Sequence, residues 1–415
     1  MSTSIARGGQ PSSIQTVLER YVADRAIAGA AALVWRGGHL VRLTCVGERD
    51  LASHEPVERD TIFRIASMTK PVTAVAALRL LEAGRFRLET PISDVAPELT
   101  HLRVLRDPEG ALDDTVDANR PITFLDLLTH RSGLTYGEFH AGPIGPAYAD
   151  ALGTQIDNDL SPDEWIARLA TLPLIDQPGG GFHYGVSSDL LGFLLARLSH
   201  ATVGEVFDQL IFAPLGMRDT GFTVPATARH RRAGLCGFDD AGIPVPLTVA
   251  PGGHALAERP DGMTFESAGQ GLWSTLDDYL AFARLFIGDG EVDGTRLLRP
   301  ETLAMMTSNQ LTPHQRSQAR LLGQPPFAEG HGYGMGVAVV MEPEKASPLR
   351  GRGGVGTVSW PGAYGGWWQA DPTDRSILLL LTHHMVDLHQ LMQGIGLGVW
   401  SAIVDFHAQA TAVDE

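Results

Sequence analysis

The distribution of strand-like and helical patterns along the 415 residues constrains the fold of this chain more than any other feature. Near the N-terminus, two apolar runs over residues 30–35 and 40–46 flank Arg36-Gly37-Gly38-His39, which predicts a β-hairpin. Strand-like runs return only in the last third, and helical spacing dominates the middle. Strands at both ends with helices between them predict one α/β layer built from the two chain ends, with a helical domain inserted.

The same pattern suggests where the two domains divide. We expect a discontinuous α/β domain that combines residues 1–85 with residues 330–415, and a mainly helical domain over residues 86–329. Loops over residues 136–160 and 311–330 are expected to line a pocket. The expected helices cover residues 14–27, 67–85, 122–130, 162–172, 188–199, 203–212, 275–287 and 387–408, and the later strands cover residues 334–341, 355–360, 366–370 and 376–383.

One lysine stands out as a candidate for chemistry. The chain has two lysines and thirty arginines, and Lys70 follows Ser67 by three residues, whereas Lys345 lies in a charged, loop-like segment. Arginine cannot lose its proton in a protein, but a buried lysine can become a base. On a helix that starts near Ser67, the two side chains share a face one turn apart. They form a candidate nucleophile and base, and the alternative is a helix N-cap followed by a surface lysine.

Two further segments are candidates for the same site. Tyr184 follows the run Gly179-Gly180-Gly181 and precedes Ser187-Ser188-Asp189, which is typical of a loop that leads into a helix. The segment 359–366 places glycines beside a strand, where a free backbone N–H could help to bind an oxyanion. Taken alone, each segment has a structural alternative. Tyr184 could simply pack under a loop, and segment 359–366 could simply form a tight turn.

Together these segments resemble a known family. Ser67-Met68-Thr69-Lys70, Tyr184 and Trp360-Pro361-Gly362 resemble the three ordered motifs of the serine β-lactamase and penicillin-binding-protein fold, and most of all the family VIII carboxylesterases, which are similar to class C β-lactamases. The resemblance runs from about residue 15 to residue 400 and implies an α+β fold, with an antiparallel sheet flanked by helices and the active site between the two domains. Further segments typical of these enzymes are residues 122–134, 214–222 and 269–275.

The resemblance implies a role for each matching residue. Ser67 would be acylated, and Lys70 and Tyr184 would share the general base and acid work. The backbone N–H groups of Ser67 and Ala363 would form the oxyanion hole. Trp360 stands where the lactamases usually carry lysine or histidine. Trp360 and Gly362 are expected to contact substrate, as is Tyr136, which resembles a position seen in related esterases and whose alternative is packing. His183 is expected at the pocket as the neighbour of Tyr184, and its alternative is a surface position.

Departures from the lactamase pattern narrow the expected function. Tyr184-Gly185-Val186 lacks the asparagine of the second motif, and Trp360-Pro361-Gly362 lacks the cation of the third, which favours a neutral ester over a charged antibiotic. We therefore expect a serine carboxylesterase that acts on short-chain esters through an acyl-Ser67 intermediate. The alternatives are an acyltransferase, an amidase or D-aminopeptidase, a β-lactamase, and a non-catalytic binding protein, which the intact Ser67, Lys70 and Tyr184 disfavour.

Composition excludes several classes of partner. The net charge of −16 argues against nucleic acid and anionic membranes, and it favours a small-molecule substrate. No metal or organic cofactor is expected, and no pattern specifies an oligomeric state. Two cysteines make no disulfide framework, and the first residues lack an apolar signal stretch, so we expect a cytoplasmic enzyme. His383-His384 lacks metal-ligand spacing, and because adjacent strand residues face opposite ways, a structural role is favoured over a metal or triad role.

Overall fold

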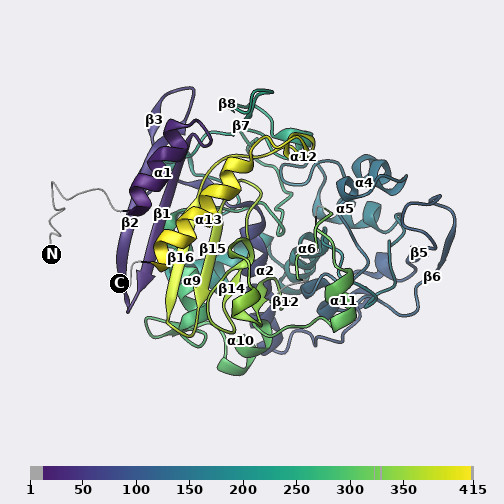
Figure 1. Ribbon diagram of the computed structural model, residues 1–415. Coiled ribbons are helices and arrows are strands. Elements are labelled where there is room, and N and C mark those ends of the chain that lie inside the picture. The colour runs from purple at the N-terminus through teal and green to yellow at the C-terminus, as the bar shows by residue number, and fades with distance from the viewer. Residues whose placement is uncertain (1–12, 322, 328–329, 413–415) are drawn as a thin grey trace.

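The computed structural model describes residues 13–321, 323–327 and 330–412, in which a central sheet is covered by helices on both faces (Figure 1). Within these residues the sheet has eight strands in the order β12-β13-β14-β15-β16-β1-β2-β3, and every neighbouring pair is antiparallel. The α+β fold with an antiparallel sheet from both chain ends is thus confirmed. The strands are β1 (Gly29–Arg36), β2 (His39–Asp50), β3 (Glu55–Pro56), β12 (His331–Tyr333), β13 (Ala338–Val340), β14 (Val358–Ser359), β15 (Trp367–Asp371) and β16 (Ser376–Leu381).

Strand β1 joins the two ends of the chain in the middle of the sheet. It forms the expected hairpin with β2 and pairs on its other edge with β16, with Ala31 opposite Leu381. A strand that is buried on both faces has a continuous run of apolar residues, and the first six residues of β1 are all buried. The N-terminal hairpin therefore carries the strand against which the C-terminal strands assemble.

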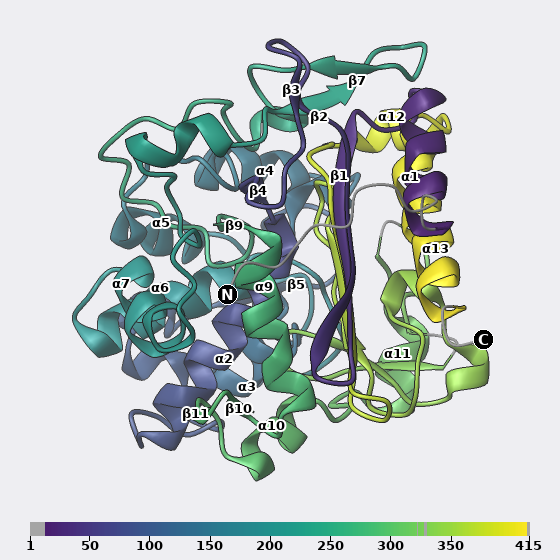
Figure 2. The same cartoon turned by 90° about the vertical axis from the view of Figure 1, so that its left-hand side faces the viewer.

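Alternation along β1 assigns its side chains to two different cores. Ala30, Ala32 and Val34 pack on one face with α1 (Ser13–Ala23) and α13 (Leu397–Thr411). Ala31 and Leu33 belong to the larger core on the other face. Figure 2 shows the sheet edge-on, with α1 and α13 on one side and α2 (Thr69–Glu82) and α9 (Leu276–Ala283) on the other. Helix α2 is buried along nearly its whole length, so the residues at its start are held firmly.

Between β3 and β12 the chain is mainly helical, with short strand pairs between the helices. Residues of this part and of the sheet share one continuous hydrophobic core, and the division at residues 85 and 330 stays a prediction. The helices are α3 (Phe124–Leu128), α4 (Ile144–Leu152), α5 (Pro162–Leu169), α6 (Ser187–Ser199), α7 (Val203–Phe207), α8 (Ala213–Leu215), α10 (Pro300–Met306) and α11 (Pro313–Gln318). The strand pairs are β4 (Phe63–Arg64) with β9 (Trp273–Ser274), β5 (Arg103–Leu105) with β6 (Thr115–Asp117), β7 (Cys236–Phe238) with β8 (Pro244–Pro246), and β10 (Glu291–Val292) with β11 (Thr295–Arg296).

The expected closing helix over residues 387–408 is wrong in one respect, because two helices replace it. Helix α12 (Leu388–Met392) ends before Gly394, and α13 begins after Gly396. Both glycines have positive φ, 86° and 78°, which ends a right-handed helix. The expected loops over residues 136–160 and 311–330 each contain a helix, α4 and α11, so these segments are more ordered than the proline and glycine content predicted.

No single helix in the described residues has the length and hydropathy needed to cross a bilayer. One pair of helical segments, Ser187–Ser199 and Val203–Leu215, meets those criteria only when the two are taken together, and they meet at an angle of 80°.

Candidate active site

Ser67 lies in a tight turn at the N-terminal end of α2. The expected helix over residues 67–85 begins two residues late, because Ala66–Met68 form a 3-10 turn and Ala66 has a φ of 42°. A non-glycine residue in this left-handed region is strained and persists only where its surroundings fix it. The carbonyl of Met68 accepts a hydrogen bond from Tyr279 on α9 at 3.0 Å. The turn is thus fixed, and Ser67 lines a cavity of about 700 Å³.

The lysine of the sequence motif contacts the serine directly. The Lys70 Nζ donates to the Ser67 Oγ at 3.1 Å, to the Tyr136 hydroxyl at 3.2 Å and to the Gly269 carbonyl at 3.0 Å. The side chain is 1% exposed, and no carboxylate of a described residue lies within salt-bridge distance of it. A helical offset of three residues therefore produces the contact between the Ser67 and Lys70 side chains that the spacing predicted.

Tyr184 approaches Lys70 with its ring. The Lys70 Nζ lies 4.5 Å from the centre of the Tyr184 ring, and the phenol oxygen accepts a hydrogen bond from Trp360 Nε1 at 3.0 Å. An indole N–H only donates, so the direction of this bond is fixed and the Tyr184 proton remains available to another acceptor. Trp360, which in the sequence stands where the lactamases usually carry lysine or histidine, thus contacts this tyrosine directly.

The segment of the third motif brings the backbone N–H of Ala363 to the same cavity as the backbone N–H of Ser67. Gly362 packs against the Ser67 turn, and a Cβ there would lie 2.3 Å from the Ile65 carbonyl oxygen. Only glycine permits this approach. Neither the N–H of Ser67 nor that of Ala363 has a hydrogen-bond partner among the described residues. Both residues line the cavity, as do Trp360 and Gly362.

A chain of amides extends the site beyond the three motifs. Gln270 donates to the Tyr136 hydroxyl at 3.2 Å and to the Gln155 side-chain oxygen at 2.7 Å. Gln155 in turn donates to Glu138 at 2.5 Å. Burial raises the pKa of Tyr136 well above its usual value, so this phenol stays protonated. Only the similarity of residues 269–275 to the family pointed to Gln270, and no sequence signal singled out Gln155.

Asp189 is a second residue whose place in the site the sequence did not reveal. Its carboxylate accepts from the Ser267 hydroxyl at 2.6 Å and from the Gly269 N–H at 3.0 Å. These bonds fix the position of Gly269, whose carbonyl accepts a hydrogen bond from Lys70 Nζ. Burial raises the pKa of Asp189, while Lys70 and the hydrogen bonds oppose that rise. Because the residue follows Ser187 and Ser188 at a helix start, its sequence resembles an ordinary cap.

His183 does not join the substrate cavity. Its Nε2 is paired with Asp176 at 2.8 Å, and the residue is absent from the cavity lining. Its neighbour Tyr184 does line the cavity, because consecutive residues of the extended loop point in different directions. The expectation that His183 contacts substrate is therefore not met by this geometry, whereas Tyr136, Trp360 and Gly362 do line the cavity.

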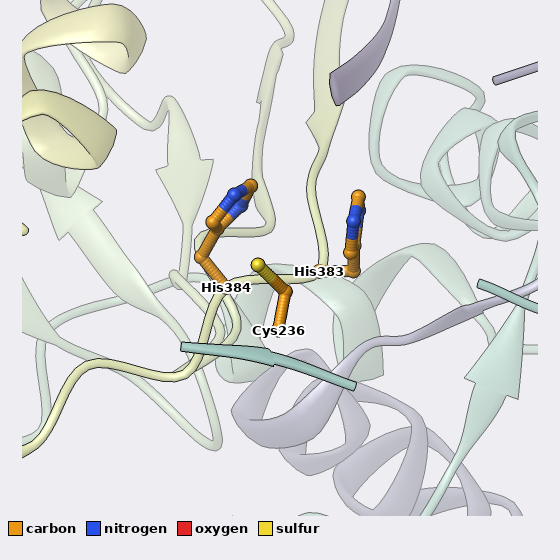
Figure 3. Close-up of side chains that lie close together, drawn as sticks. All are labelled: Cys236, His383 and His384. Carbon is orange, nitrogen blue, oxygen red and sulfur yellow. The ribbon is translucent and has the colours of Figure 1, made fainter. Parts of the chain in front are cut away.

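His383 and His384 lie beside Cys236, and these three form the one group of metal-ligating types that lies close together in the described residues (Figure 3). The imidazole rings are 4.9 Å apart rather than on opposite faces, because β16 already ends at Leu381. His384 Nε2 accepts the Ala28 N–H at 2.7 Å, which places the ring proton on Nδ1. His384 then has no free lone pair for a metal, and its hydrogen bond to Ala28 supports a structural role.

The buried His383 makes stability dependent on pH. Burial lowers its pKa from 6.5 to about 4. Between these values the unfolded chain binds the proton and the folded chain does not, so the free energy of unfolding falls as pH falls, by about 3 kcal/mol over the window. In urea titrations at pH 7 and pH 4.5, His383→Leu should lose less stability on acidification than the parent. An equal loss in both proteins would contradict this assignment.

Comparison with known proteins identifies the family. Residues 14–392 match the family model described as Beta-lactamase. The chain belongs to the β-lactamase family. Protein Rv1367c of Mycobacterium tuberculosis strain H37Rv is 44% identical over 367 residues, which cover 87% of each chain. Esterase EstB of Burkholderia gladioli is 33% identical over 386 residues, which cover 89% of each chain. The solved structure of EstCE1, described as a hydrolase with promiscuous acyltransferase activity, has a TM-score of 0.75 and 26% identity, covering 94% of this chain and 97% of its own.

These likenesses confirm the resemblance to β-lactamase-like esterases. As a member of the β-lactamase family with esterase relatives, the protein is an enzyme of the serine hydrolase class, and the likeness to named esterases indicates a carboxylic ester hydrolase.

Proposed function

We propose that this β-lactamase family member is a family VIII carboxylesterase that hydrolyses short-chain carboxylic esters through an acyl-Ser67 intermediate. One observation carries the proposal: the Lys70 Nζ lies 3.1 Å from the Ser67 Oγ at the wall of a cavity of about 700 Å³. A serine hydroxyl reacts only when a neighbour takes its proton, and this contact supplies that neighbour.

In the acylation step, the Ser67 oxygen forms a bond to the ester carbonyl carbon, and Lys70, in the form that has released one proton to solvent, takes the hydroxyl proton along the contact between Nζ and Oγ. Negative charge develops on the carbonyl oxygen. The free N–H groups of Ser67 and Ala363 supply two donors for that oxygen, because neither is used by the described residues. The carbon–oxygen bond to the leaving alcohol then breaks, and the alkoxide must receive a proton.

Tyr184 is suited to supply that proton. Its oxygen accepts the Trp360 N–H at 3.0 Å, which leaves the phenol proton free and stabilises negative charge that develops after transfer. The proton passes from Lys70 to Tyr184 once the alcohol leaves. Water then attacks the acyl carbon, the same groups take its proton, and the Ser67–acyl bond breaks to release the acid and restore the serine.

The aromatic wall supports the preference for short acyl chains. Tyr136, Phe139 and Trp360 line the cavity and pack around Tyr184, with ring centres 5.3–6.4 Å from its own. These close-packed rings restrict the space directly beside the reacting groups, although the whole cavity is about 700 Å³.

Covalent trapping tests the intermediate. The enzyme is mixed with 4-nitrophenyl butyrate, quenched in acid within milliseconds to seconds, digested and analysed by mass spectrometry. We expect a butyryl group on the peptide that contains Ser67, and turnover that falls from butyrate to decanoate. A chromogenic cephalosporin is compared in parallel. Acylation of another residue would refute the proposal, and cephalosporin opening faster than ester cleavage would make the enzyme a β-lactamase.

A matched pair of variants assigns the proton donor. Tyr184→Phe should lower kcat by about 10²- to 10³-fold, because it removes the phenol proton. Tyr136→Phe should lower it by about tenfold or less, because Lys70 keeps its contacts with Ser67 and Gly269. Steady-state ester hydrolysis by both variants measures the two effects. The reverse order would make Tyr136, which contacts Lys70 directly, the proton donor.

An acyltransferase is the second candidate, and the description of EstCE1 as a hydrolase with promiscuous acyltransferase activity favours it. The acyl-enzyme would then pass its acyl group to an alcohol instead of water. Product analysis after adding a small alcohol separates the two functions. A new ester indicates transfer, whereas free acid alone indicates hydrolysis.

A further inference from the structure

Arg350 lines the same cavity as Ser67 but belongs to none of the sequence motifs. It ends a 3-10 turn, Pro348–Arg350, in the connection between β13 and β14. Its guanidinium stacks on Trp360, with the Cζ atom 5.2 Å from the ring centre. Trp360 in turn packs against Tyr184, with ring centres 5.3 Å apart. The cation is therefore one side chain away from the proposed proton donor.

No counter-ion accompanies this cation. The Arg350 side chain makes no hydrogen bond or ion pair with any residue that the structure describes, and its Nε is buried without a partner. Two arginines with well-buried side chains are neutralised, because Arg64 and Arg259 each lie 2.8 Å from the carboxylate of Asp157. Burial lowers the pKa of Arg350 to about 10, so the group remains charged at neutral pH. A partly buried charge without a partner is costly, and binding of an anion would offset that cost.

The acidic residues that line the cavity are already engaged. Glu138 accepts from Gln155 at 2.5 Å, and Asp189 is held by Ser267 and Gly269. Asp387 accepts from the backbone N–H groups at the start of α12, at 2.9 and 3.1 Å. None of the three pairs with Arg350, so the anion that this guanidinium would bind has to come from outside the chain.

We propose that Arg350 binds a carboxylate carried by the substrate, so that esters bearing a free carboxylate are the preferred substrate class. The inference rests on the proposed esterase function and deepens it. A guanidinium stacked on an aromatic face keeps its N–H edge free for a coplanar, bidentate carboxylate. Arg350 thus supplies a cation near the third motif, although the motif itself lacks one. The missing lysine of that motif had suggested a neutral ester, and the proposal revises that expectation.

Paired esters test which half of the substrate carries the carboxylate. Mono-4-nitrophenyl adipate is compared with its methyl ester for the acyl side, and 4-butyryloxybenzoate with its methyl ester for the alcohol side. The readout is the ratio of kcat/KM between the anionic and the neutral member of each pair. In Arg350→Gln at least one ratio should fall by about 10- to 100-fold, mainly through KM, with Arg350→Lys in between.

Arg352→Gln is the matched control, because it makes the same charge change two residues away at an exposed side chain that does not line the cavity. Its ratios should equal those of the parent. Parent ratios that persist in Arg350→Gln for both pairs would overturn the proposal. Thermal unfolding of each variant verifies that it is folded.

A binding measurement separates this inference from the proposed function. Calorimetry with each anionic ester compares Ser67→Ala with the double variant Ser67→Ala/Arg350→Gln, in which turnover plays no part. Tenfold or more weaker binding of at least one ester to the double variant supports the carboxylate site even if the parent hydrolyses no ester. Equal binding overturns it even if ester hydrolysis is fast.

Discussion

Ester hydrolysis by Ser67→Ala is expected to fall by about 10⁴- to 10⁶-fold in kcat, the range seen when the nucleophile of a serine hydrolase is removed. The methyl side chain cannot form an acyl-enzyme, while the cavity and the two free N–H groups remain. Residual turnover would come from those features alone. Initial rates with 4-nitrophenyl butyrate measure the loss, together with the thermal midpoint to verify the fold.

Ser317→Ala provides the control, because Ser317 is an exposed residue of α11 and its hydroxyl donates only to a local carbonyl. Its rate should match that of the parent. Turnover by Ser67→Ala within tenfold of the parent would mean that another group attacks the ester, and the butyryl label would then have to appear elsewhere.

Replacing Lys70 with arginine is expected to lower kcat/KM by about 10³- to 10⁴-fold, although arginine is also a long hydrogen-bond donor. Arginine cannot give up its proton under these conditions, so it cannot act as a base. Lys70→Met, which keeps the length without the amine, should be equally slow. Both variants are compared with the parent on the same ester.

The chain offers an exact counterpart for this experiment, because it contains one other lysine. Lys345 is exposed and pairs with Glu342 at 2.5 Å. Lys345→Arg makes the same substitution at the surface and should leave turnover unchanged. If Lys70→Arg kept more than a tenth of the parent activity, proton transfer by Lys70 would be excluded and its role would reduce to charge.

Local patterns predicted the features that depend on local geometry. The hairpin that forms β1 and β2 is visible in two apolar runs around a glycine turn, and the Ser67–Lys70 contact follows from helical spacing. Helix α4 was missed because Gly145 and Pro146 disfavour a helix in isolation. Burial of Ile144, Tyr148 and Leu152 stabilises it in the folded chain.

Contacts between residues far apart in the sequence could not be predicted from local patterns. Gln270 reaches Tyr136 across 134 residues, and Arg350 stacks on Trp360 from a turn whose composition resembles any surface loop. The sequence left His183 between the pocket and the surface, and in the structure the loop turns it toward Asp176 and away from the cavity. Side-chain direction in an irregular loop is set by tertiary packing, and no periodic pattern in the sequence predicts it.

The pairing of β1 with β16 has a consequence for biosynthesis. While the ribosome is still adding residues, β1 is available long before β16, so an apolar strand has one unpaired edge for most of translation. Such edges pair readily with other chains. The active-site turn after residue 65 likewise lacks its glycine neighbour until residue 362 has emerged. The active-site turn is therefore completed only late in translation, and nascent chains are the stage most exposed to aggregation.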